Sequence, residues 1–170
     1  STVQRSARAE VRAKLSQFVR ARWFAPPFGG AIFSGLLLDA FAAMAAGPKG
    51  APLLPEAQPL DLMVTVTDFA GHLETMRLNS PAEVAETEHR LIFAFHHGPG
   101  HADDLADTPG LVFAARATAS FPGAFPPFTA RELDRVLARR GIDWAGRAAF
   151  LRRQLCPDDD ECAAEDRALV

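Results

Sequence analysis

Apolar residues recur every three or four positions near the start of the chain, with Arg, Gln and Ser between them over residues 4–22. This period is typical of an amphipathic helix. The apolar positions are Val3, Ala7, Val11, Leu15, and Phe18 with Val19. We interpret the segment as a surface helix that packs one stripe on a core. The other interpretation is a basic amphipathic helix that lies on an anionic membrane.

Two later stretches have the composition of β-strands. Residues 60–69 (LDLMVTVTDF) are rich in β-branched residues and nearly continuous in apolar character. This pattern predicts a strand buried on both faces, ended by Ala70-Gly71. Residues 90–96 (RLIFAFH) predict a second, shorter strand.

Capping signals and apolar periodicity predict helices in four further places. Gly47-Pro48 ends the first of them, and Thr108-Pro109 supplies the cap and first position of the second. A capping box from Thr129 to Glu132 opens the third. The predicted helices cover residues 31–46, 108–120, 129–140 and 144–155. Residues 47–59, with four prolines, and the polar residues 97–107 are predicted loops.

Buried strands separated by helices predict an α/β domain with a largely parallel sheet. Two strands are few for 170 residues, and a two-stranded parallel sheet cannot bury itself. The chain also does not begin with Met, so we expect a processed chain, a piece cut from a longer one, or an incomplete reading of one. A piece with unfinished sheet edges is expected to aggregate or dimerise.

The amino-acid composition limits the kinds of partner and the cellular compartment that we expect. The formal net charge is -3, so nothing attracts the whole chain to nucleic acid. Residues 1–22 are nevertheless basic, and the tail at 156–170 is acidic. Two cysteines do not make a disulfide framework, and no stretch approaches the roughly 20 apolar residues of a membrane-spanning helix. We therefore expect a cytoplasmic protein that can associate peripherally with the inner membrane.

The serines do not lie in a nucleophile elbow, which requires Gly-x-Ser-x-Gly on a strand-to-helix turn. Ser34 sits inside a predicted helix, and no serine has glycine two positions before it. Gly29-Gly30 could offer backbone amides to an oxyanion, but no strand precedes it. We interpret that pair as a helix-entry turn. The chain is predicted to carry no catalytic residue of its own.

Histidines and carboxylates gather near the second strand and the loop after it: His89, His96, His97, His101, Asp103 and Asp104. These side chains can bind zinc or manganese, but their spacing matches no known ligand pattern. The segment Cys156–Cys162 has neither zinc spacing nor the alternating ligands of an EF-hand. We interpret it as part of a disordered acidic tail, in which a local disulfide would form only in an oxidising compartment. No metal or cofactor is predicted.

The residues Ala114–Phe128 (AARATASFPGAFPPF) run from a small-residue helix into an aromatic, proline-rich loop. Pro122, Pro126 and Pro127 forbid continuation of the helix, and Gly123 permits a tight reversal. Phe121 and Phe125 are then displayed from a rigid loop. Such a loop can wall an apolar substrate pocket, or it can be a packed corner of the core.

Three segments of the chain resemble the patatin-like phospholipase family, most closely its bacterial patatin-related branch. The Ala114–Pro127 segment is similar to the family's Ser-x-x-Pro-x-x-Phe-x-Pro block and is the most specific match. Leu62–Phe69 with Gly71 looks like its central strand, which ends in Thr-Asp. Pro26–Gly30, with the helix to Met44, is similar to the segment before that strand. Together the matches span roughly residues 23–128.

The resemblance implies a three-layer α/β/α fold with a mostly parallel sheet and hydrolysis of phospholipid or another acyl-ester lipid at a membrane surface. The family uses a Ser-Asp dyad, with serine in Gly-x-Ser-x-Gly and aspartate in Asp-Gly-Gly or Asp-Gly-Ala. This sequence contains neither motif and no Asp-Gly pair. We therefore expect one partial domain over residues 1–170: a middle piece that lacks both catalytic ends and is inactive alone. The alternative is a degenerate relative that binds lipid or protein without hydrolysis.

The resemblance also implies roles for particular residues. Ser120, Phe121, Pro122 and Phe125 would shape the acyl-chain pocket and support the segment that leads to the aspartate. Arg116 would be either a buried ion-pair partner or a contact to the lipid headgroup. Around the family-like core at 23–128 lie the basic helix at 1–22, the helices at 129–155 and the acidic tail at 156–170.

Overall fold

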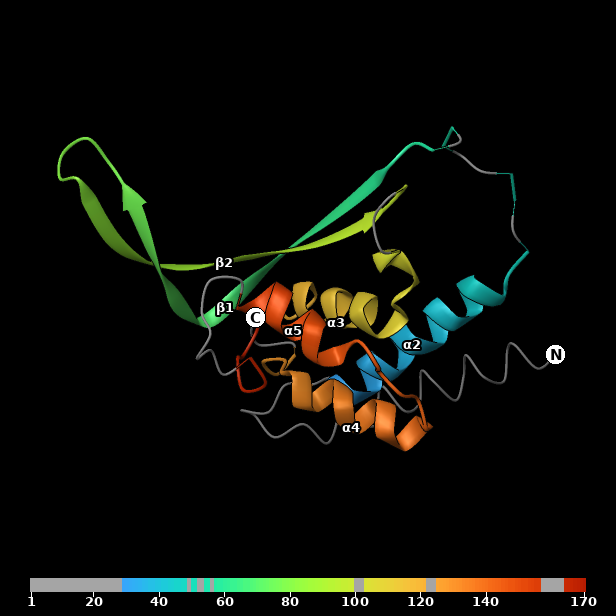
Figure 1. Ribbon diagram of the computed structural model, residues 1–170. Helices are drawn as coiled ribbons and strands as arrows, with labels where there is room; N and C mark the ends of the chain where they lie inside the picture. The colour runs from blue at the N-terminus through green and yellow to red at the C-terminus, as the bar shows by residue number, and fades with distance from the viewer. Residues whose placement is uncertain are drawn as a thin grey trace.

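A long two-stranded hairpin lies over a body of helices in the computed structural model (Figure 1). The structure describes residues 29–48, 50–51, 54–55, 57–99, 103–121, 125–156 and 164–170. The basic helix expected over residues 1–22 lies outside the described residues, as do His101, Pro122 and residues 157–163, which include the whole segment between the two cysteines. Among the helices that the structure describes, none has the length and apolar character needed to cross a membrane.

The two strands are antiparallel and consecutive in the chain. Strand β1 (Leu60–Arg77) pairs with β2 (Glu83–His97), from Leu60 opposite His97 to Arg77 opposite Glu83. The expectation of a three-layer α/β/α fold with a mostly parallel sheet is therefore wrong for the described residues. A parallel pair needs a crossover of a dozen or more residues, whereas residues 78–82 alone connect these strands.

Only one face of the hairpin is buried, and only in the half that lies over the helices. Val66, Phe93 and Phe95 point inward and are buried, because alternate residues of a strand share a face. On the other face Met63 is 65% exposed and Ile92 is 50% exposed. The prediction of a strand buried on both faces is wrong for this reason.

A bulge divides the hairpin into two halves. The register shifts between Thr67 and His72, and Gly71 adopts a positive φ of 76°, a conformation that glycine reaches without strain. The Ala70-Gly71 pair therefore interrupts the strand without ending it. Beyond the bulge the hairpin continues as an arm that extends past the helices (Figure 1).

The predicted helices are confirmed, with small shifts at their ends. They are α2 (Gly30–Ala46), α3 (Thr108–Thr118), α4 (Ala130–Arg140) and α5 (Arg147–Leu155), with a 3-10 turn η1 (Asp104–Ala106) before α3. The cap of α3 is Asp107 rather than Thr108, because the Asp107 carboxylate accepts the amide of Gly110. Helix α4 ends at Gly141 in the left-handed region.

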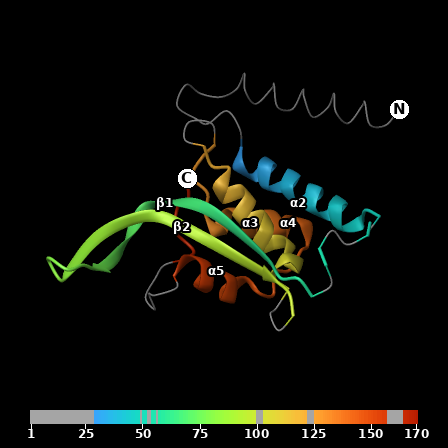
Figure 2. The same ribbon diagram turned by 90° about the horizontal axis from the view of Figure 1, so that it is seen from above.

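An aromatic core joins the helices to the inner face of the hairpin. Helix α3 packs under β1 and α5 under β2, as the view from above shows (Figure 2). Phe113 of α3 lies 4.9 Å from Phe128 and 5.6 Å from Phe150, between ring centroids. Such ring pairs contribute about 0.5–1.5 kcal/mol each beyond their buried area. This cluster holds the hairpin on the helices.

The end of the chain returns to the sheet. Leu169 is fully buried and bridges both Asp68 and Phe128 in antiparallel fashion. The Phe69 amide donates to Ala168 O, and the Val170 amide donates to Thr67 O. The last residues of the expected acidic tail thus form a short added strand beside β1. Cys156 is buried and disulfide-bonded, a bond that the sequence alone suggested only for an oxidising compartment.

Candidate functional site

A buried arginine lies where helices α2, α3 and α4 and the Phe-Pro loop meet. Arg116 of α3 has no exposed surface. Its guanidinium donates to Ser120 Oγ at 2.6 Å and to the Pro126 carbonyl at 3.2 Å. Its Nε lies 3.4 Å from Oε1 of Glu132. Of the two roles open to Arg116, the structure shows the buried ion-pair partner.

Three aromatic rings surround the same guanidinium. Its central carbon lies 5.0 Å from the ring centroid of Phe128, 5.5 Å from Phe125 and 6.0 Å from Phe33. Phe33 and Phe125 also stack on each other at 5.0 Å. Rings within about 6 Å attract a cation through their quadrupole. Inside the protein, the guanidinium therefore contacts both the carboxylate of Glu132 and the faces of aromatic rings.

Burial and pairing act on Arg116 in opposite directions. Loss of water lowers the pKa of the guanidinium below its ordinary value, and the Glu132 carboxylate opposes that shift. An arginine stays charged under all physiological conditions, so the net result is a buried cation fixed by its partners. Removing one partner would leave an uncompensated buried charge, which is strongly destabilising. We therefore interpret the cluster as a structural unit.

The glycine pair before α2 belongs to this cluster. A Cβ on Gly30 would lie 2.5 Å from Glu132 Oε1 and 2.7 Å from Nη2 of Arg116. Only glycine lets the start of α2 approach the ion pair so closely. Gly29 is the N-cap of α2 in an extended conformation, so the interpretation as a helix-entry turn is confirmed.

The predicted pocket residues have dissimilar environments. Ser120 is buried and both accepts from and donates to Arg116 groups, Phe125 is half-buried against Phe33, and Phe121 is 70% exposed. Pro122 lies outside the described residues. These side chains do not line either of two surface hollows, one beside His97 and the other between α2 and α4. The described part of the loop is anchored to α2 and α3 at one end and open to solvent at Phe121.

One serine does lie beside a carboxylate. Ser34 Oγ donates to Glu132 Oε1 at 3.3 Å, and a carboxylate near a serine hydroxyl can in principle act as its base. Ser34 is fully buried, however, and Glu132 is held in the ion pair with Arg116. A substrate carbonyl cannot reach this hydroxyl. The contact ties α2 to α4 and is not an active site.

Sequence reasoning missed the role of Glu132. It assigned this residue to a capping box, but Thr129, the N-cap of α4, makes no side-chain capping bond. Glu132 instead turns toward Arg116 and Ser34. The only available signal was a carboxylate in the first turn of a helix that follows the Phe-Pro loop. That signal fits both a capping box and an ion pair with Arg116.

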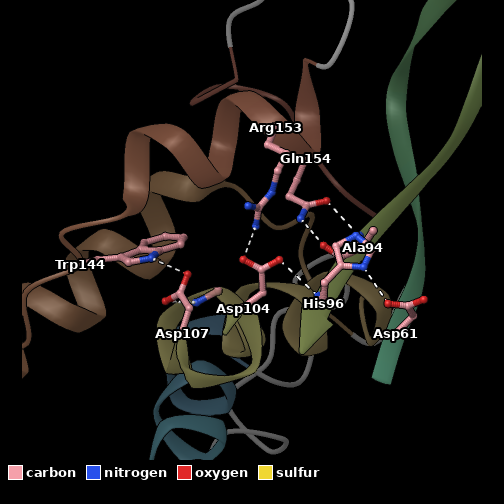
Figure 3. A network of polar contacts seen from close by, with 9 residues as sticks. Asp61, Ala94, His96, Asp104, Asp107, Trp144, Arg153 and Gln154 are labelled. Carbon is pink, nitrogen blue, oxygen red and sulfur yellow. Dashed lines mark hydrogen bonds and ion pairs between the residues drawn. The ribbon is translucent and has the colours of Figure 1, made fainter. Parts of the chain in front are cut away.

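Two of the histidines, His96 and His97, each pair with a single carboxylate. His96 contacts Asp61 (Figure 3), with Nδ1 2.7 Å from Oδ1. His97 Nδ1 lies 2.9 Å from Asp103 Oδ1. His89 Nδ1 is 2.8 Å from the Asp68 carbonyl. In the part of the chain that the structure describes, no three His, Cys, Asp or Glu side chains gather in a way that could hold a metal.

A polar network connects the hairpin to α5 and to the turn before α3 (Figure 3). The Gln154 side chain accepts from the amide of Ala94 at 3.1 Å and donates to its carbonyl at 2.8 Å. Asp104 accepts the His96 amide and also the Arg153 guanidinium. The nearby Trp144 indole donates to Asp107. These side chains bond backbone groups of Ala94 and His96 on the outer edge of β2. Their arrangement does not resemble a substrate-binding site.

Comparison with protein-family models, with curated proteins and with solved structures found no match for this chain.

Proposed function

We propose that the chain is part of a patatin-like lipid acyl hydrolase and has no catalytic activity by itself. The observation that carries this proposal is the cluster around Arg116. It joins Phe33, from the first patatin-like segment, to Arg116 and Phe125, from the most specific one. Segments matched separately along the sequence thus pack as one unit.

The third segment belongs to the same unit. Helix α3, which carries Arg116, packs under β1, and β1 contains the Thr-Asp sequence at Thr67-Asp68. Asp68 is fully buried and lies 3.3 Å from Arg167. A shared core of this kind supports a common origin for the three matches more strongly than isolated motifs do.

The proposed substrate is a phospholipid or another acyl-ester lipid presented at a membrane surface. Phe121, which is 70% exposed beside the anchored loop, is suited to contact an acyl chain. The described serines do not offer an accessible hydroxyl beside a free carboxylate, and the sequence has no Gly-x-Ser-x-Gly or Asp-Gly. The nucleophile and base would therefore come from other parts of a longer protein.

A second candidate is a module that binds lipid or protein without hydrolysis. It is favoured by one observation, the apolar side chains exposed along the hairpin. Met63, Phe69 and Leu73 are each more than half exposed, although they sit in regular strand structure. Exposed apolar patches often mark interaction sites.

The test uses the longest protein that the source gene encodes. We would incubate it with a fluorophosphonate probe, map the adduct by peptide mass spectrometry and assay release of fatty acid from phosphatidylcholine vesicles. The proposal predicts hydrolysis and a single adduct on a serine outside residues 1–170. A gene that encodes no further serine–aspartate pair, together with vesicle binding and no hydrolysis, would favour the binding module.

A further inference from the structure

One side of helix α2 is apolar and exposed. Of its 17 residues, only Ser34 and Asp39 have polar side chains. A helix that is apolar on all sides is normally buried on all sides. Helix α2 packs against α3 and α4, yet Ile32 is 45% exposed and Met44 is 74% exposed. This composition therefore indicates that another segment covers the exposed side of α2.

A surface hollow between α2 and α4 lies on the exposed side of α2. Ile32 and Leu36 from α2 and Val136 from α4 contribute to its apolar lining. The lining includes Ala31, in the first turn of α2, so the hollow is close to the point where the preceding chain enters the helix. Three charged residues also line it: Asp39, Arg139 and Arg140. A segment that comes from the chain before α2 can thus reach this hollow directly.

The chain before α2 contains an amphipathic segment of suitable length. Residues 4–22 have the helical apolar pattern described above, and residues 23–28 connect them to Gly29, the N-cap of α2. Pro26-Pro27 in this connection prevents one continuous helix. Connections of about two to eight residues join helices that are antiparallel neighbours in bundles. Residues 4–22 are therefore expected to fold back along α2.

The apolar positions of the two segments match in spacing and in offset. Both segments repeat apolar residues every four positions, and both helices rise by about 1.5 Å per residue. If the chain reverses at residues 25–26, three apolar pairs lie side by side: Val19 with Ile32, Leu15 with Leu36, and Val11 with Ala40. We propose that residues 4–22 form a helix that docks antiparallel on α2 and fills the hollow between α2 and α4.

Charge complementarity also favours this segment as the occupant. Asp39 is the only charged residue of α2, and in the same register it lies opposite Arg12. Asp39 already accepts two hydrogen bonds from Arg140, but a carboxylate has about four acceptor sites, so it can also accept Arg12. The apolar stripe of residues 4–22 is itself uncharged, so it does not repel Arg139 at the hollow.

Docking on α2 and binding to a membrane use the same apolar stripe. The side chains that would enter an anionic bilayer are those that face α2 in the proposed arrangement. Because the segment is covalently attached next to α2, docking there benefits from a high effective concentration. We therefore expect residues 4–22 to cover α2 without any membrane present.

Hydrogen exchange in the full chain tests the docking. An undocked helix of this length is marginal in water, so strong protection of the amides of residues 8–19 reports packing. We expect these amides to exchange at least about tenfold more slowly than in an unstructured peptide. Ile32→Asp should abolish this protection, because it places a charge beneath the docked helix. The amides of α3 should stay protected, since Ile32 is partly exposed.

Ala42→Asp is the matched control. Ala42 is an exposed residue of α2 outside the proposed contact, so its replacement should leave residues 8–19 protected. Unprotected amides at residues 8–19, or equal protection in the two variants, would overturn the proposal. Protection that appears only with vesicles containing phosphatidylglycerol would assign the stripe to a membrane instead. Protection that is lost on dilution from about 20 to about 1 μM would assign it to a second copy, because intramolecular docking does not depend on concentration.

Discussion

Arg116 shows how one side chain can organise segments that are far apart in the sequence. Its contact with Ser120, four residues later, follows from helical spacing and could be predicted from the sequence. Its ion pair with Glu132 and its contact with Phe33 depend on how α2 and α4 pack on α3. The sequence left two roles open for Arg116, because a lone arginine within an apolar helix fits either an ion pair or an anionic ligand.

Replacing Arg116 should strongly destabilise the fold. Arg116→Met leaves the Glu132 carboxylate without its cation, and breaking a buried pair in this way costs about 3–5 kcal/mol. Urea denaturation followed by circular dichroism would measure the change in the free energy of unfolding. The matched control is Arg135→Met on α4, an exposed arginine, which should change stability by less than about 0.5 kcal/mol. Equal effects of the two changes would contradict the structural role of Arg116.

A second residue-scale prediction concerns pH. Arg140 donates two hydrogen bonds to Asp39, and they lower the pKa of that carboxyl below 3.8. A carboxyl with a lowered folded-state pKa stabilises the fold above its unfolded-state pKa and loses that effect as pH falls through the folded value. Because the pair is exposed, the contribution is at most about 0.5 kcal/mol.

The variant Arg140→Gln should therefore raise the pKa of Asp39 toward 3.8 and remove this acid-sensitive contribution. An NMR titration of the Asp39 carboxyl carbon would measure the shift. Arg139→Gln, one position earlier, is the control and should leave the titration unchanged. An Asp39 pKa that does not move in Arg140→Gln would show that the pair does not form in solution.

Among the elements, the helices were easier to predict than the hairpin. Capping residues and glycines fix helix ends locally, whereas the partner of a strand depends on the chain that follows it. The central strand looked buried on both faces because Thr65 and Thr67 are β-branched, yet both face solvent. The arm beyond Gly71 was missed because its few apolar residues, Leu73, Met76 and Val84 among them, lie between polar ones without a regular alternation.

Gln154 connects helix α5 to strand β2. Its side chain makes the two backbone hydrogen bonds at Ala94 that a third strand would otherwise make. Gln154→Leu should leave the Ala94 amide and carbonyl unpaired and cost about 1–3 kcal/mol. Hydrogen exchange at the Ala94 amide should also accelerate. Gln58→Leu changes an exposed glutamine and serves as the control. Unchanged exchange at Ala94 in the Gln154 variant would argue against this capping role.

At the scale of the whole molecule, the described residues form a helical body that carries a two-stranded sheet, one face of which is exposed. The resemblance led to the expectation of a mostly parallel sheet, but the only connection between the two described strands is too short to place them in parallel. For the Phe-Pro loop, the residues alone left two interpretations open, a wall of an apolar pocket and a packed corner of the core. Its anchor on Phe33 required the fold.

The central claim about function is that this chain carries no catalytic serine. Labelling the chain with a fluorophosphonate and reading its intact mass tests that claim most directly. We predict no increase in mass after exposure to the probe, since Ser34 and Ser120 are buried and bonded to Glu132 and Arg116. An adduct mapped to either serine would contradict the account and would mean that the chain has an active site of its own.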